Sequence, residues 1–363
     1  MTSRRGLVRR LRAGVAPFAK QTLLRTGGYD TIRRLLPSRR LAILRYHAIC
    51  GASGYRYADP GICITPESFE QHVAYLTQRY AVLNLEHAVA QLIAGKPLPR
   101  NAVAITFDDG YADNLAAAHT LAKYGASATF YITAGCMAGG QPFWPAELRH
   151  LVNSIADRRV SLRADNLDVE IDLSSDLARA GAVRRLTKVF KSHPIPVREA
   201  LLEQLRVHAR GSDFPRVMLT WDEVRDMHAL GMTIGSHTLT HPNLPSAGLA
   251  AARHELAASK ARLEEEISAP VTMFSYPNGG AERYITRELQ QAVRQAGYAA
   301  AATSRNGFAG PDTDVYALER IEVEESLADL VFALEVERFV LGPTPESAEK
   351  HEWIGSQSYE GTN

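Results

Sequence analysis

Cysteine is scarce in this chain of 363 residues, which has only Cys50, Cys63 and Cys136, with no close-spaced pair among them. A sparse and odd number of cysteines argues against a disulfide framework and against a metal site built from thiolates. Long apolar runs are also missing, since no stretch approaches the roughly 18 uninterrupted apolar residues of a membrane-spanning helix. The composition, 45% hydrophobic and 22% charged, is that of an ordinary globular protein with a sizeable core.

The N-terminus also lacks the features of a secretory signal. It begins with positive charge, but Arg9, Arg10, Arg12 and Lys20 interrupt any apolar segment that a signal peptide would need. The default expectation is therefore a cytoplasmic protein, with peripheral contact at the inner face of the membrane as an option.

Charge is distributed unevenly along the chain. Residues 1–40 contain eleven Lys and Arg against one acid, Asp30, whereas the whole chain has a net charge of only +1. This basic N-terminal arm allows two interpretations. Its apolar residues recur at roughly helical spacing, which is typical of an amphipathic helix on an anionic membrane; the other interpretation is a solvated, partly disordered leader. Those apolar residues are Leu7, Val8, Leu11, Val15 and Phe18. Without a binding motif or aromatic platform, nucleic-acid binding is not expected.

After residue 40, apolar strand patterns alternate with helix patterns. This alternation predicts a mostly parallel sheet with helices outside it, and the number of strands suggests a distorted (β/α) barrel. We expect the barrel over residues 41–341, a mostly helical insertion over about 141–219 with an edge strand or hairpin at 167–173, and a flexible tail at 342–363. The strands are predicted at 41–47, 81–85, 103–107, 128–132, 233–236, 271–276, 298–303 and 318–322.

Three of the predicted strands end on chemically active residues. The strand 103–107 ends on Asp108 and Asp109, the strand 233–236 on His237, and the strand 271–276 on Pro277 and Asn278. In a barrel these ends converge on one rim, where the chemistry of such folds gathers.

His237 and His241 are four residues apart, a spacing that on a helical turn presents two imidazoles to one point. One added carboxylate gives three protein ligands and leaves a position for water, as in catalytic zinc sites. Alone, Asp108-Asp109-Gly110 would read as a tight turn, and the two histidines as surface residues. Together, each after an apolar strand, they favour a metal site with a neighbouring carboxylate base.

The segments Thr106–Gly110 and Ser236–His241 resemble the two signature motifs of the polysaccharide deacetylases, carbohydrate esterases that include the NodB-like chitooligosaccharide enzymes. The resemblance covers roughly residues 41–340. It implies a distorted (β/α) barrel that removes N- or O-acetyl groups with a divalent metal, usually zinc. It also implies Asp108 as the catalytic base and Asp109, His237 and His241 as the metal ligands.

Other parts of the sequence depart from the family pattern. Ser275 stands where the family has an arginine that steers the base, so the sequence alone does not show how Asp108 is oriented. Asn278 stands in the place of a tyrosine, although its backbone N–H could help hold an oxyanion, and Pro277 matches. The final strand region, 318–323, contains no histidine to act as the acid.

His47 is the alternative candidate for the acid. Residues 43–49 resemble the first strand of the poly-N-acetylglucosamine deacetylases, which also lack the late histidine and for which an early one is proposed. The other interpretation is a histidine that caps a core strand by hydrogen bonding. Tyr111 is a candidate for the mouth of the site, and Phe143 and Trp144 either stack on a sugar or pack in the core.

The predicted function is metal-dependent hydrolysis of an acetamido (or O-acetyl) group on a polysaccharide or sugar precursor, in exopolysaccharide or cell-envelope carbohydrate metabolism. Two alternatives remain open. The first is deacylation of a lipid-linked sugar intermediate, which a basic arm of residues 1–40 would suit. The second is a catalytically weak carbohydrate-binding protein on the same scaffold, which the missing arginine, tyrosine and late histidine favour.

Overall fold

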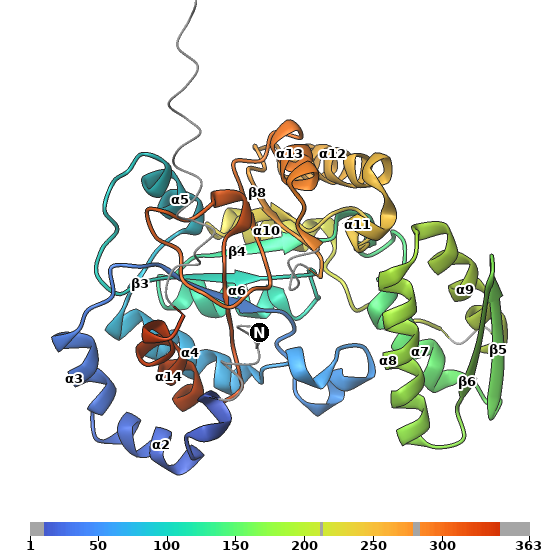
Figure 1. Ribbon diagram of the computed structural model, residues 1–363, viewed down its shortest axis with the longest axis horizontal. Helices are drawn as coiled ribbons and strands as arrows, with labels where there is room; N and C mark the ends of the chain where they lie inside the picture. The colour runs from blue at the N-terminus through green and yellow to red at the C-terminus, as the bar shows by residue number, and fades with distance from the viewer. Residues whose placement is uncertain (1–10, 211–212, 279–283, 342–363) are drawn as a thin grey trace, which may run out of the picture.

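A curled parallel sheet lies at the centre of the computed structural model, with helices around it (Figure 1). The structure describes residues 11–210, 213–278 and 284–341. The strands of the sheet are β1 (Ala42–Tyr46), β2 (Ala81–Val82), β3 (Ala102–Phe107), β4 (Ala128–Ile132), β7 (Thr233–Ser236), β8 (Met273–Ser275), β9 (Ala300–Ala302) and β10 (Ile321–Glu322). Their order is β10-β1-β3-β4-β7-β8-β9, with β2 paired to β3, and these pairings are parallel as predicted.

The sheet curls far enough for its two edges to meet through the segment that leads into β10. Leu318 bridges to Ala302 of β9, while Ile321 pairs with Leu44 of β1. Two backbone hydrogen bonds hold the first of these contacts, from Thr303 N to Leu318 O and from Leu318 N to Ala301 O. The architecture is therefore the predicted distorted (β/α) barrel.

The central strands are buried along their whole length. Every residue of β1, β3 and β4 is buried, as expected for parallel strands that are covered on both faces. On the outer face of the sheet, where the helices pack, Phe107 stacks on Phe130 with ring centroids 4.5 Å apart, and Tyr46 stacks on the other side of Phe107 at 5.3 Å. The covering helices are α4 (Pro66–Arg79), α5 (Leu85–Ile93), α6 (Asn114–Lys123), α10 (Trp221–Ala229), α11 (Leu244–Ala247), α12 (Leu249–Ile267), α13 (Arg287–Gln295) and α14 (Leu327–Glu335).

The predicted insertion forms a lobe at one end of the molecule (Figure 1). It has an apolar cluster of its own, in which Leu148, Leu162, Leu186 and Leu205 are fully buried. The alternating stretch near residue 170 is one strand of an antiparallel hairpin, as the sequence suggested. The lobe consists of α7 (Trp144–Ser154), β5 (Arg159–Ala164), β6 (Leu167–Asp172), α8 (Asp176–Ser192) and α9 (Ile195–His208).

The described part of the basic N-terminal arm packs against the barrel. It forms α2 (Pro17–Arg25) and α3 (Gly28–Leu35), which contact α14. Arg12 pairs with Glu337 at 2.6 Å, and Lys20 pairs with Asp329 at 2.7 Å. Residues 11–36 are thus part of the fold and not a solvated leader.

Two of the three described residues of the predicted apolar face of the arm turn towards the protein. Leu11 and Val15 pack against the cluster of Tyr29, Val331 and Phe332, and Phe18 is exposed. Leu7 and Val8, like the predicted tail at 342–363, lie outside the described residues. Among the residues that the structure describes, no helix has the length and apolar character to cross a bilayer.

Candidate active site

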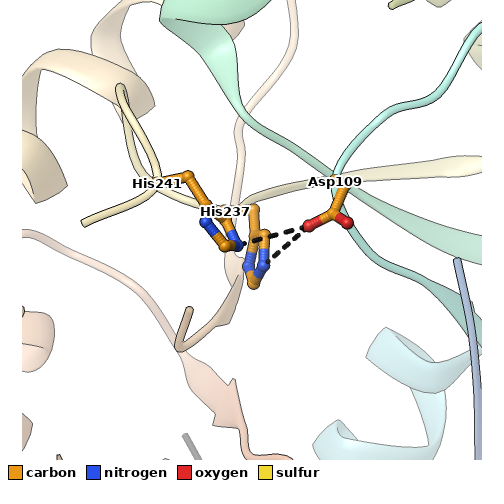
Figure 2. Close-up of side chains that lie close together, drawn as sticks. All are labelled: Asp109, His237 and His241. Carbon is orange, nitrogen blue, oxygen red and sulfur yellow. Dashed lines mark ion pairs between the residues drawn. The ribbon is translucent and has the colours of Figure 1, made fainter. Parts of the chain in front are cut away.

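Asp109, His237 and His241 converge at the carboxyl ends of β3 and β7, two strands that flank β4 in the sheet (Figure 2). Asp109 follows β3, and His237 follows β7 directly. The Oδ1 atom of Asp109 lies 3.4 Å from Nε2 of His237 and 3.3 Å from Nε2 of His241. All three side chains are buried, and their potential ligand atoms lie within 4.8 Å of one another.

These distances fit a shared metal better than direct hydrogen bonds. The oxygen–nitrogen separations of 3.3 and 3.4 Å exceed the usual N–H···O range, which ends near about 3.2 Å. Ligand atoms on a tetrahedron with bonds of about 2.1 Å are about 3.4 Å apart, which matches. One carboxylate oxygen and two imidazole nitrogens also form a donor set typical of catalytic zinc, with a fourth position left for water.

The two histidines are presented by a loop and not by a helical turn, so this part of the sequence-based interpretation was wrong. Thr238 and His241 have positive φ values of 69° and 56°, which fold the chain back on itself. Glu255 of α12 holds the turn, because its carboxylate accepts hydrogen bonds from the backbone N–H groups of Leu239 and Thr240, each at 2.8 Å.

Strained backbone is concentrated at this site. In the described part of the chain, eight non-glycine residues have positive φ, and four of them are Asp109 (80°), Thr238, His241 and Asn278 (60°). Such conformations cost of order 1–3 kcal/mol each and persist where the surrounding structure imposes them. The fold therefore accepts a conformational free-energy cost at the barrel rim, where these residues are held in place.

The imidazole of His237 is oriented by the backbone. Its Nδ1 lies 2.8 Å from the carbonyl oxygen of Ser275, so Nδ1–H donates there and Nε2 keeps its lone pair towards Asp109. His241 lacks such a partner for Nδ1 within the described residues. Burial lowers the pKa of His241 to about 4, so its imidazole is neutral at physiological pH.

The insertion lobe holds the backbone of the histidine loop. The indole N–H of Trp144 donates to the carbonyl oxygen of His241 at 2.9 Å. The buried guanidinium of Arg198 donates to Thr240, to its carbonyl oxygen at 3.2 Å and to its Oγ1 at 3.3 Å. Phe143 and Trp144 are 1% and 3% exposed, so packing explains them and sugar stacking does not.

Asp108 points to the other side of the strand end, where Arg320 binds it through a two-pronged ion pair. Both contacts, Nη1 to Oδ1 and Nη2 to Oδ2, measure 2.7 Å. Burial alone would raise the pKa of Asp108, but the charge of Arg320 lowers it well below its usual range. The adjacent acids thus face different partners, as the sequence suggested.

Arg320 supplies the guanidinium that the sequence pattern lacked. It is 1% exposed, donates from Nε to the carbonyl oxygen of Thr303 at 2.7 Å, and donates from Nη2 to Ser275 Oγ at 3.0 Å. Ser275 stands in the place of the family's arginine, and Arg320 sets the orientation of Asp108 that the sequence alone did not show. A charged residue just before a buried strand was the available signal, because a buried arginine requires a carboxylate partner.

His47 lies on the same rim, with Nε2 at 3.8 Å from Oδ2 of Asp108. Its side chain is 18% exposed, so it is accessible from the rim. Asn114 holds its backbone by donating from Nδ2 to the His47 carbonyl oxygen at 2.8 Å, and Asp113 accepts from the N–H of Ile49 at 3.0 Å. Burial lowers the pKa of His47, against the opposing charges of Asp109 and Asp108.

The three predicted substrate contacts lie in different environments. Tyr111 is 2% exposed and packs edge-on against Phe143 at 5.7 Å, so it lies among packed side chains. Pro277 and Asn278 follow β8 at the rim, and Nδ2 of Asn278 is buried without a partner in the described part of the chain. Gly279 lies outside the described residues. Contact of Tyr111, Pro277 and Asn278 with a substrate stays a prediction.

The sequence profile of the polysaccharide deacetylases matches residues 95–163 and 170–301, which is more than half of the chain. The chain belongs to the polysaccharide deacetylase family. This family member is therefore a hydrolase of carbon–nitrogen bonds other than peptide bonds.

A curated relative supports this membership. YxkH of Bacillus subtilis (strain 168), whose name gives polysaccharide deacetylase as its expected activity, is 24% identical over 300 residues, which are 82% of this chain and 76% of YxkH.

Solved structures show the same fold. The Streptococcus pyogenes deacetylase PplD, determined with acetate, aligns with a TM-score of 0.56 at 19% identity, over 85% of this family member and all of PplD. IcaB from Ammonifex degensii aligns with a TM-score of 0.52 at 17% identity, over 82% of this family member and 98% of IcaB.

Proposed function

We propose that this family member is a metal-dependent deacetylase that removes N-acetyl (or O-acetyl) groups from a polysaccharide or sugar precursor of exopolysaccharide or cell-envelope metabolism. The observation that carries the proposal is the arrangement of side chains at the rim. A carboxylate held by Arg320 lies beside a buried set of one aspartate and two histidines whose spacing suits a tetrahedral metal.

In this proposal Asp109, His237 and His241 hold the metal, for which zinc suits the donor set best. A divalent metal at such a site lowers the pKa of water and polarises the carbonyl of the acetyl group. Asp108 accepts the proton of the attacking water. Because Arg320 binds both of its carboxylate oxygens, Asp108 keeps one orientation and stays ionised.

His47 is proposed as the acid that protonates the leaving amine. It lies 3.8 Å from Asp108, so donor and base face the same space. Burial lowers the pKa of His47, and the negative charges of Asp109 and Asp108 oppose that shift and favour the protonated, proton-donating form. The backbone N–H of Asn278 is proposed to stabilise the oxyanion of the tetrahedral intermediate.

The exopolysaccharide assignment rests on the resemblance of residues 43–49 to the poly-N-acetylglucosamine deacetylases. The alternative target is a lipid-linked sugar intermediate, for which residues 1–40 would supply peripheral membrane contact. The same site residues would act on either substrate, so only an assay with both substrates distinguishes the two proposals.

The catalytically weak, carbohydrate-binding alternative was favoured by the missing arginine, tyrosine and late histidine. Arg320 provides a guanidinium at the base, which weakens the first of these three arguments. In a protein that binds carbohydrate without catalysis, nothing would maintain the spacing of Asp109, His237 and His241 that suits a metal.

Acetate release across a panel of N-acetylated and O-acetylated oligosaccharides and a lipid-linked acetamido sugar tests the proposal. The wild type is compared with Asp108→Asn and His47→Gln, and we expect each variant to lose about 10²–10⁴-fold in kcat. Binding of the oligosaccharides without any acetate release by the metal-loaded wild type would instead favour the carbohydrate-binding function.

A further inference from the structure

A basic hollow of about 380 Å³ opens on the surface beside α3 and α4. Its lining includes Arg33, Arg34, Arg79 and Arg100. Asp30 pairs with two of them, Arg33 at 2.5 Å and Arg79. Arg34 and Arg100 are exposed and have no acidic partner in the part of the chain that the structure describes. The hollow therefore keeps an excess of positive charge.

Exposed apolar side chains lie near this hollow, since Leu35 and Leu36 stand in the chain between Arg34 and Pro37, which line it. Leu35 and Leu36 are 73% and 56% exposed, and Phe339 and Val340 are 59% and 40% exposed. The two pairs are neighbours, because Arg338 donates from Nη2 to the carbonyl oxygen of Leu36 at 2.6 Å. Single exposed apolar residues are ordinary on a protein surface, but four of them beside an unneutralised basic hollow form an amphipathic surface.

This surface lies at the opposite end of the sheet from the candidate active site. Arg100 and Asn101 directly precede β3, whereas Asp108 and Asp109 directly follow it. A strand of six residues spans about 20 Å, so the two features are separated by about that distance along the barrel. They can therefore be occupied at the same time.

The helices that carry the surface are fixed to the barrel. Lys20 of α2 pairs with Asp329 of α14, and Arg33 of α3 approaches Glu335 of α14 at 3.6 Å. Tyr29 of α3 is 1% exposed in the same interface. The arginines and leucines are consequently presented on a rigid platform.

We propose that the docking surface, formed by Arg34, Arg100, Leu35, Leu36 and Phe339, binds an anionic phospholipid membrane. The arginines match the phosphate-bearing headgroups, and the apolar side chains enter the boundary between headgroups and acyl chains. A free phosphate ion would satisfy the arginines but leave the apolar side chains in water. A lipid surface matches both the arginines and the apolar side chains.

Docking in this orientation directs the candidate active site away from the bilayer, towards glycan in the aqueous phase. Arg34, Leu35 and Leu36 belong to the N-terminal arm, but the docking surface is not the apolar face predicted for that arm, because Leu11 and Val15 pack against the protein. The proposal does not depend on the proposed deacetylation, and its test does not measure catalysis.

Co-sedimentation of the full-length protein with vesicles tests the electrostatic contribution of the arginines. Vesicles of phosphatidylcholine alone are compared with vesicles that also contain phosphatidylglycerol, at low and high salt. We expect binding only to the anionic vesicles, weakened by salt, and at least about tenfold weaker binding for Arg34→Glu/Arg100→Glu. The matched control, Arg184→Glu/Lys188→Glu on exposed positions of α8, changes the net charge equally and should bind like the wild type.

The contribution of the apolar side chains is tested with Leu35→Ser/Leu36→Ser, which should also weaken vesicle binding. Its control is Leu177→Ser/Val207→Ser, at positions of the insertion lobe that are 78% and 69% exposed. Wild-type vesicle binding by both docking-surface variants would overturn the proposal. So would binding of inorganic phosphate by the wild type, seen by calorimetry, without binding to anionic vesicles.

Discussion

At the scale of single residues, the contact between Arg320 and Asp108 governs the proposed chemistry. The guanidinium satisfies both carboxylate oxygens and is itself fixed by Thr303 and Ser275. A lysine would keep the charge but lose this planar two-pronged geometry. Position 320 therefore tests orientation of the base separately from its charge.

Replacing Arg320 with lysine should lower kcat by about tenfold or more, with little change in KM and with metal binding retained. The reason is that Asp108 stays ionised but loses its fixed direction. Steady-state acetate release and metal titration measure the two effects. A lysine variant with the kcat of the wild type would show that Arg320 does not position the base.

Asp113 predicts a pH dependence of stability. Burial raises its pKa from 3.8 to about 6, so the folded state loses stability as the pH rises from about 4 to above 6. This loss is about 3 kcal/mol for a shift of about two units. Asp113→Asn can keep the hydrogen bonds to Ile49 and Tyr57 and should be more stable than the wild type at pH 8 but not at pH 4. Urea unfolding of the metal-free proteins at the two pH values measures the difference, and equal stability at pH 8 would contradict it.

Residues next to one another in the sequence were predictable, and distant partners were not. Asp108, Asp109 and the two histidines are visible because each follows an apolar strand. Arg320 is 212 positions from Asp108, so no spacing connects them before the barrel closes. The left-handed turn between His237 and His241 was also hidden, because it depends on Glu255 of α12.

At the scale of elements, the insertion lobe supports the proposed metal site. Arg198 of α9 and Trp144 of α7 hold the carbonyl groups of Thr240 and His241. The sequence predicted helices and a hairpin in this region from local periodicity. It could not predict which loop they touch, since that contact is tertiary.

Arg198→Ala should weaken zinc binding by about 10–100-fold, the usual effect of losing a group that orients a metal ligand. Arg179→Ala is the matched control, because Arg179 donates to the carbonyl groups of Val152 and Ile155 within the lobe and does not reach the histidine loop. Competition with a chromophoric chelator gives both affinities. Equal zinc affinity of the two variants would show that the lobe does not support metal binding.

At the scale of the whole molecule, the N-terminal helices complete the fold. The barrel was predictable from the alternation of strands and helices, but the packing of residues 11–36 was not. Their many arginines suggested a surface arm, because a charge count does not show that Arg12 and Lys20 face Glu337 and Asp329.

Arg12→Ala should reduce the free energy of unfolding by about 3–5 kcal/mol at pH 7, because Glu337 would be left buried and unpaired. Arg12→Ala/Glu337→Gln should recover part of this loss, and Arg25→Ala, at an exposed position of α2, should have little effect. Urea unfolding compares the three variants. An Arg12→Ala protein as stable as Arg25→Ala would indicate that the N-terminal segment is not part of the cooperative fold.

The central claim is that Asp109, His237 and His241 hold a metal that deacetylation requires. The most direct measurement is acetate release from an N-acetylated oligosaccharide by metal-stripped protein, before and after one equivalent of zinc. The account predicts no release before, turnover after, and neither zinc retention nor turnover for Asp109→Ala. Full activity of the metal-stripped wild type, or of Asp109→Ala, would contradict it.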